Sequence, residues 1–154
     1  MSQYVSFYMK PKSGKREDWI LLGDFCGSSS VYRAANPYLP YGEGMCLKAE
    51  LLRDIKQDIK EDIGRYRAML SDEDHKQELI CKMQNVSLQD RLEEIAESET
   101  AKAGIQEEID ECESALGWYS TLLDIAEATE FCEDNFNATA IWGGVEWSPS
   151  SLYE

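Results

Sequence analysis

The chain has 154 residues with 15 basic and 30 acidic side chains, and its net charge is −15 at neutral pH. This length fits one domain with a hydrophobic core, and the charge argues against direct binding of nucleic acid, which needs a basic surface. No run of about 18 apolar residues is present, so no transmembrane helix is expected, and the first residues lack the pattern of a signal peptide. We therefore expect a cytoplasmic protein that does not contact membranes.

Both ends of the chain favour strands. The segments 3–10 (QYVSFYMK) and 18–26 (DWILLGDFC) are rich in strand-forming residues, and the residues between them suit a hairpin loop. Near the other end, 138–147 (ATAIWGGVEW) predicts a third strand, in which Gly143 and Gly144 would produce a bulge or a bend. These strands predict one small antiparallel sheet built from both ends of the chain.

Two short elements are expected after the first two strands. Residues 28–36 (SSSVYRAAN) predict a short helix capped by a serine. The prolines and glycines of residues 36–44 (NPYLPYGEG) predict a loop.

The middle of the chain predicts helices. We expect one near 46–70, a short one near 72–85 and a long one near 88–131, with capping boxes that begin at Ser71 and Ser87. Apolar residues recur at spacings of three and four in the first helix, at Leu52, Ile55, Ile59, Ile63, Tyr66 and Leu70. The long helix repeats the pattern at Ile105, Ile109, Cys112, Leu116, Tyr119, Leu123 and Ala126. These stripes predict a seam in which the helices pack along each other.

The polar residues Ser98 and Lys102 interrupt the seam, so the sequence leaves open whether the long helix is continuous there or bends or breaks. Together these elements predict an α+β fold, in which a long acidic helical hairpin, similar to a coiled coil, is inserted between the strands of a small antiparallel sheet. We expect a single domain, 1–154. Residues 1–47 and 135–154 would form an aromatic β-rich module, and residues 48–134 the acidic helical insertion.

The charge is concentrated in the insertion. Residues 48–134 carry ten basic and twenty-four acidic side chains, a net charge of −14, whereas residues 1–47 carry +1 and residues 135–154 carry −2. Acids recur every four residues at Glu50, Asp54, Asp58 and Asp62, although like charges at this spacing cost a helix roughly 0.2–0.5 kcal/mol per pair. Their side of the helix has few basic partners available within the chain, while the basic side can lie along the long acidic helix.

Two interpretations of this acidic row remain open. A run of charge is most often a solvated helical face. The other interpretation is a surface that binds a basic groove, because carboxylates four residues apart recur about every 6 Å, a distance comparable to the spacing of phosphates along a nucleic-acid strand. Glu107, Glu108 and Glu111 of the long helix are candidates for the same partner-binding surface as the four acids above.

The sequence contains no motif for catalysis, nucleotide binding or metal binding, so a non-enzymatic protein without cofactor is expected. His75 is the only histidine, and its acidic neighbours are explained by a helix N-terminus rather than by a metal site. The five cysteines have no paired spacing and are expected to be small buried residues: Cys26, Cys46, Cys81, Cys112 and Cys132.

In size and charge, the chain resembles the small acidic inhibitors that phages use against host defence nucleases, including anti-CRISPR proteins and DNA mimics. The resemblance covers composition and no motif. It implies an inhibitor in the cytoplasm of the host cell, which occupies the basic groove of a nuclease or another nucleic-acid-binding protein. The alternative is a structural or assembly protein that forms a homodimer through the helical seam.

Overall fold

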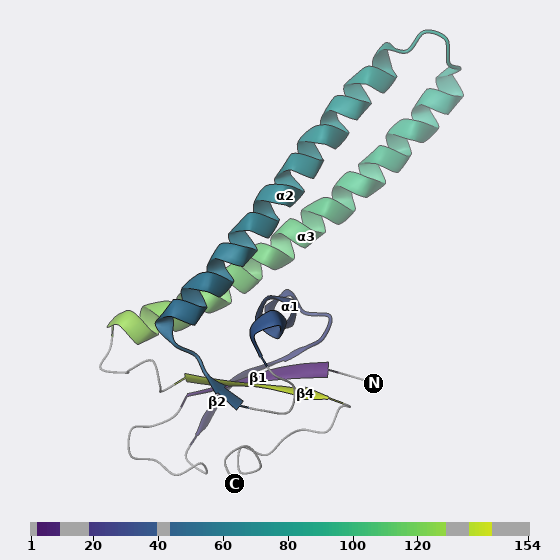
Figure 1. The fold of residues 1–154 in the computed structure, drawn as a ribbon. Helices are drawn as coiled ribbons and strands as arrows, with labels where there is room; N and C mark the ends of the chain where they lie inside the picture. Colours follow the sequence, from purple (N-terminus) through teal and green to yellow (C-terminus); the bar gives the residue numbers. More distant parts are fainter. Residues whose placement is uncertain (1–2, 10–18, 40–43, 129–135, 143–154) are drawn as a thin grey trace.

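The computed structural model describes residues 3–9, 19–39, 44–128 and 136–142, which form an α+β fold dominated by two long helices (Figure 1). The predicted fold class is confirmed at this level. In chain order the elements are β1 (Gln3–Met9), β2 (Ile20–Cys26), α1 (Ser30–Ala35), the 3-10 helix η2 (Asn36–Tyr38), β3 (Gly44–Cys46), α2 (Ala49–Lys82), α3 (Leu88–Ala128) and β4 (Phe136–Trp142).

The four strands form one antiparallel sheet in the order β2-β1-β4-β3. The predicted strands at 3–10 and 18–26 correspond to β1 and β2, and β4 overlaps the strand predicted at 138–147. Gly143 and Gly144, where a bulge or bend was expected, lie outside the described residues. Pairing of β1 with β4 places strands from distant parts of the sequence side by side in the centre of the sheet.

Helix α1 agrees with the prediction, whereas the loop that should follow it does not. Ser29 caps α1, and its Oγ accepts a hydrogen bond from the amide of Val31 at 3.2 Å. The predicted loop at 36–44 begins with η2 and ends in β3, because Pro37 suits the start of a helical turn and Gly44 pairs with β4. A three-residue strand such as β3 is held by its partner strand and leaves almost no local pattern in the sequence.

The predicted break between two helices at Ser71 is wrong, since α2 is continuous from Ala49 to Lys82. No proline or glycine stands near Ser71 to end the helix, and the acids that follow it have partners on α3. Glu73 accepts a hydrogen bond from Ser98 at 2.6 Å, and Asp74 pairs with Lys102 at 2.6 Å.

The same contacts answer whether the long helix is continuous near these positions, which the sequence leaves open. Helix α3 is continuous through Ser98 and Lys102. Ser98 is buried, and Lys102 lies between Asp74 and Gln77, so the polar positions of the seam bind each other across the two helices. The predicted cap at Ser87 is confirmed, because its Oγ accepts a hydrogen bond from the amide of Asp90 at 3.1 Å.

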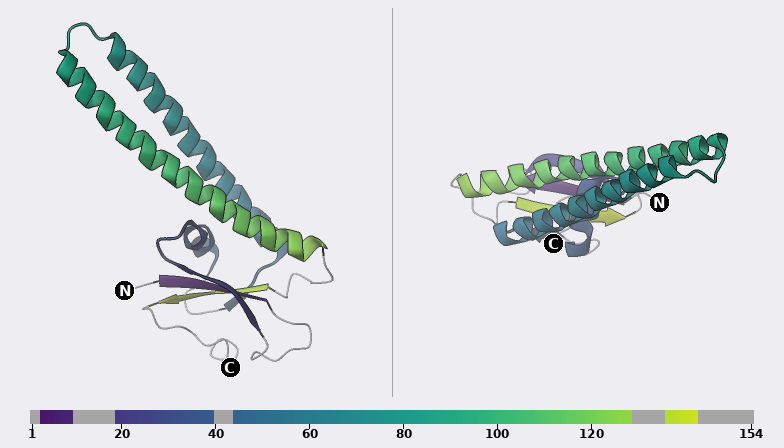
Figure 2. Two further views of the ribbon diagram at one scale, coloured as in Figure 1. Left: turned by 180° about the vertical axis from the view of Figure 1, so that it is seen from behind. Right: turned by 90° about the horizontal axis from the view of Figure 1, so that it is seen from above.

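Helices α2 and α3 lie side by side and antiparallel, and they extend far beyond the sheet (Figures 1 and 2). We call them the helix pair. The predicted apolar stripes form its seam next to the sheet, where the following residues are buried: Leu52, Ile55, Ile59, Ile63, Ile109, Cys112, Ala115, Tyr119, Leu122 and Leu123. Four predicted seam residues are only half-buried: Tyr66, Leu70, Ile105 and Leu116. The side chain of Ala126 lies outside the described residues, and Ala115 and Leu122 are buried in addition to the residues we predicted.

An aromatic cluster joins the sheet to the helix pair. The ring of Phe7 on β1 packs edge-on against Trp118 and Tyr119 of α3, with centroid distances of 5.6 and 5.9 Å. A Cβ on Gly23 would approach the Trp118 ring to 3.2 Å, so the absence of a side chain there lets the ring lie against β2. The buried hydroxyl of Tyr119 donates to the carbonyl of Val31 at 2.6 Å, which also ties α1 to α3.

Candidate functional site

The acidic row of α2 lies on the molecular surface. Glu50, Asp54 and Asp58 are exposed, and Asp62 is half-buried. Asp62 forms an ion pair with Arg65, one turn further along the helix. The first two acids make no contact of this kind within the described residues, so the part of the row nearest the start of α2 presents free carboxylates.

Tyr38 of η2 lies against the centre of this row. Its hydroxyl donates a hydrogen bond to Asp58. The hydrogen bond to Asp58, followed by burial and the nearby charges of Asp54 and Glu61, raises the pKa of Tyr38 to about 12. The phenol is therefore neutral at physiological pH and remains a hydrogen-bond donor.

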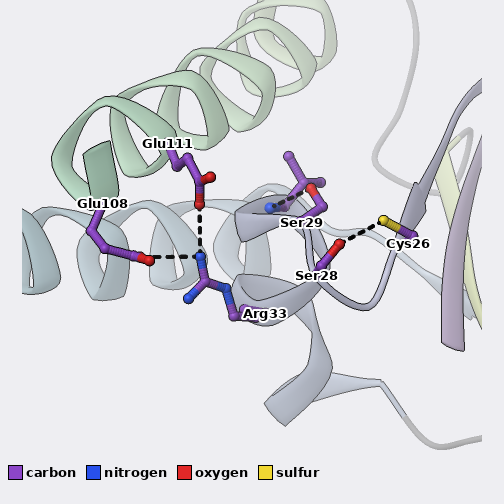
Figure 3. A network of polar contacts seen from close by, with 7 residues as sticks. Cys26, Ser28, Ser29, Arg33, Glu108 and Glu111 are labelled. Atoms are coloured by element: carbon purple, nitrogen blue, oxygen red, sulfur yellow. Dashed lines mark hydrogen bonds and ion pairs between the residues drawn. The ribbon is translucent and has the colours of Figure 1, made fainter. Parts of the chain in front are cut away.

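On α3, Arg33 binds two of the three candidate acids. Its Nη2 atom lies 3.3 Å from Glu108 and 3.1 Å from Glu111, so that one guanidinium from α1 holds two turns of α3 (Figure 3). Glu107 is exposed and has no such partner within the described residues. Since the Arg33 side chain is 47% exposed, its ion pairs are screened by water and act as a brace rather than a major source of stability.

The acidic surface therefore has more internal partners than the sequence suggested. We expected few basic residues within reach, but Arg33 and Arg65 bind three of the seven candidate residues, and Tyr38 binds a fourth. Arg65 could have been identified from its spacing to Asp62. Arg33 and Tyr38 reach the acids only because the fold places α1 and η2 beside the helix pair.

The opposite side of α2 agrees with the prediction. Arg53 pairs with Glu127 at 2.6 Å and Arg67 pairs with Glu113 at 3.1 Å, so basic residues of α2 do lie along the acidic helix α3. All four side chains are about half exposed or more, and each pair contributes only about 0–1 kcal/mol.

After these pairs are formed, many carboxylates of the helix pair remain exposed without a cation. In the described part of the chain, the exposed acids of α2 and α3 that form no ion pair are Glu50, Asp54, Asp58, Glu61, Asp72, Asp90, Glu93, Glu94, Glu97, Glu107, Asp110 and Asp124. They follow α2 and α3 from the sheet to the far end.

A groove lies where the acidic row meets the shorter helices. It has a volume of about 310 Å³ and is lined by Arg33, Ala34, Pro37, Asp58, Ile59, Glu61 and Asp62. The apolar residues Ala34, Pro37 and Ile59 are accompanied by three carboxylates of α2. This arrangement can accept the alkyl chain and the charged end of a basic side chain.

The cysteines differ from the prediction. Cys112 is buried as expected, and burial raises the pKa of its thiol. Cys26 and Cys81 are exposed, which the sequence prediction missed, while the side chains of Cys46 and Cys132 lie outside the described residues. A hydrogen bond with the Ser28 side chain lowers the pKa of the Cys26 thiol (Figure 3).

The described residues contain no group of three or more His, Cys, Asp or Glu side chains that could hold a metal ion. His75 is exposed, and its Nδ1 lies 4.0 Å from a carboxylate oxygen of Glu78. Among the helices described, none is both long and apolar enough to cross a membrane.

The chain matches no protein-family model, and comparisons with curated proteins and with solved structures give no match. The geometry of the chain itself is therefore the basis for assigning a function.

Proposed function

We propose that the protein is a non-enzymatic inhibitor that occupies the basic groove of a nucleic-acid-handling protein, as a DNA mimic or an anti-CRISPR-like phage protein would in its host cell. The observation that supports this proposal is the set of exposed, unpaired carboxylates along α2 and α3. In this proposal the two helices form an acidic, coiled-coil-like hairpin, and the whole chain acts as one domain.

The shape of the helix pair fits a groove. Helix α2 has 34 residues, and at about 1.5 Å per residue it is about 50 Å long. Exposed acids at Glu50, Asp54 and Asp58 repeat at about 6 Å along it. A row of this spacing can release the counterions of a basic groove as a nucleic-acid backbone does.

The module of residues 1–47 and 135–154 would orient the hairpin. In its described part, Arg33 braces Glu108 and Glu111, and Tyr38 binds Asp58, so these acids are held in place rather than free. The residues most available to a partner are therefore Glu50, Asp54 and Glu107.

The helical seam is not a free surface for a homodimer. Its apolar residues on α2, such as Ile59 and Ile63, share one buried core with Ile109 of α3. Self-association through the seam would require the two helices to separate, so inhibition of a basic partner is the function that the geometry favours.

The test uses charge reversal at acids that make no ion pair within the described residues. The triple variant Glu50→Lys, Asp54→Lys and Glu61→Lys leaves the contacts of Tyr38 and Arg33 intact. A matched triple variant at the far end, Glu93→Lys, Glu94→Lys and Glu97→Lys, changes the net charge by the same amount.

The probe is the heparin-binding fraction of a cell lysate, treated with nuclease and passed over the immobilised protein. We expect the wild-type protein to capture proteins that added duplex DNA releases. The first triple variant should capture them much more weakly, because the new lysines repel a basic groove. Captured proteins that DNA does not release would contradict the proposal, and equal losses in both triple variants would show that bulk charge, not the acidic row, determines binding.

A further inference from the structure

The sheet ends in strand β2, whose outer edge pairs with no other described strand. The order β2-β1-β4-β3 places β2 at one end with seven residues, and β3 at the other end with only three. An unpaired strand edge offers a row of amide and carbonyl groups to a further strand. A seven-residue edge is long enough to pair with another chain.

The side chains of β2 do not protect this edge. Ile20 is 53% exposed and Leu21 is 46% exposed, and as neighbours in a strand they point to opposite faces of the sheet. Natural edge strands are commonly protected by lysine or proline, and β2 (ILLGDFC) contains neither. Its one charged residue, Asp24, already accepts a hydrogen bond from Ser6.

We propose that two copies of the chain associate through β2, pairing antiparallel across a two-fold axis. A strand paired with its own copy in this way forms a closed, self-complementary contact. The two sheets would become one continuous sheet. This inference is independent of the proposed inhibitory function.

The distribution of charge identifies a second copy as the occupant of this edge. Residues 48–134 carry −14, so two copies repel each other at the helix pair, whereas residues 1–47 carry +1. In the described part of residues 1–47 the only charged side chains are Asp24 and Arg33, so the edge of β2 adds little net charge of its own, and the repulsion in a dimer comes from the helix pairs. A strongly basic partner would instead be attracted to the helix pair.

The symmetry also fixes where the helices lie. Antiparallel pairing of the two β2 strands requires a two-fold axis perpendicular to the sheet, which keeps equivalent faces of the two sheets on the same side. Because the helix pair covers one face of the sheet (Figure 2), the dimer would carry both helix pairs on one side of the continuous sheet.

Size-exclusion chromatography with light scattering tests the inference on the full chain. We expect twice the mass of the 17.5 kDa chain, and a dimer that persists at high salt, where screening to about 3 Å at 1 M reduces repulsion between the helix pairs. Ile20→Lys and Leu21→Lys should each weaken self-association at least about tenfold. In antiparallel pairing along the whole of β2 these positions lie opposite Cys26 and Phe25 of the second copy, where each variant replaces an apolar side chain by a charged one. Both positions are half exposed, so thermal melting should show that the variants remain folded.

The controls are Leu79→Lys and Leu92→Lys, which alter equally exposed leucines of the helix pair and should leave the dimer intact. A wild-type protein that is monomeric at high salt would overturn the inference without any variant. The inference would also be overturned if both strand variants dimerised with unchanged affinity, or if the helix controls lost as much dimer affinity as the strand variants.

Discussion

The two halves of the helix pair are built differently. Next to the sheet, the seam consists of buried apolar residues such as Ile55, Ile59 and Ile109. Among the described residues of the far half, Ile80 is the only large apolar residue that is buried, whereas Leu79 and Leu92 are 51% and 57% exposed. A polar layer separates the halves, formed by the hydrogen bond of Ser98 to Glu73 and the contacts of Lys102.

Helices α2 and α3 are therefore held together mainly next to the sheet. Each buried apolar side chain contributes about 1.5–3 kcal/mol, so most of the stabilisation lies in the first half of the pair. The far half is held by hydrogen bonds and exposed ion pairs, which contribute about 1 kcal/mol or less each. Local opening should therefore begin at the far end.

The largest effect is expected in the seam next to the sheet. Ile109→Ala should lower the free energy of unfolding by about 2–5 kcal/mol, because it leaves a cavity in the buried core. The control Leu92→Ala changes an exposed residue and should stay within about 0.5 kcal/mol. Denaturant unfolding measures both values. Equal losses of unfolding free energy in the two variants would show that the two halves of the helix pair do not differ in stability.

A smaller effect is expected at Tyr119, also in the half next to the sheet. Tyr119→Phe should cost about 1–3 kcal/mol, because the carbonyl of Val31 loses its hydrogen bond in a buried site.

Tyr119 should also make stability depend on alkaline pH. Burial raises its pKa above the value of about 10 that it has in the unfolded chain. The unfolded state therefore loses its proton first, and the stability linked to Tyr119 is complete below that value and falls as pH rises toward the folded pKa. Unfolding followed from neutral to alkaline pH should show a weaker loss in Tyr119→Phe than in the wild type. The same dependence of stability on pH in both proteins would mean that the Tyr119 phenol ionises as readily in the folded state as in the unfolded state.

The smallest effect is expected in the polar layer. Ser98→Ala should cost about 1 kcal/mol, because Glu73 loses its hydrogen bond to a buried partner. Amide hydrogen exchange should become faster between Ser98 and the far end of the pair and remain unchanged next to the sheet. Thr100→Ala serves as control, since its hydroxyl is exposed. Faster exchange along the whole of α2 and α3 would show that the two halves open together.

The parts of the fold that could be predicted are those with a local or periodic pattern. The strands β1 and β2, the serine cap of α1 and the seam positions from Leu52 to Ile63 follow from strand propensity, capping chemistry and helical spacing. Ser71 gave the wrong helix end because a serine followed by acids resembles a cap. Instead α2 continues through it, and Glu73 of this acidic stretch binds Ser98 of α3.

The candidate site could be predicted only in part, for the same reason. Exposure of Glu50, Asp54 and Glu107 follows from their position on the helices. The contacts of Arg33 with Glu108 and Glu111 join residues 75 and 78 positions apart. Such pairs depend on the tertiary arrangement, so the spacing of charges along the chain does not predict them.

The position of β4 has a consequence for the growing chain on the ribosome. β4 pairs with both β1 and β3, yet 89 residues, which include both long helices, lie between Cys46 at the end of β3 and Phe136 at the start of β4. At about 5–20 residues per second, β1 and β3 remain without their shared neighbour for roughly 5–20 seconds. Unpaired strands are prone to join those of adjacent nascent chains. The segment that emerges during this interval carries nearly all of the negative charge, so neighbouring chains on one messenger repel each other while the sheet is incomplete.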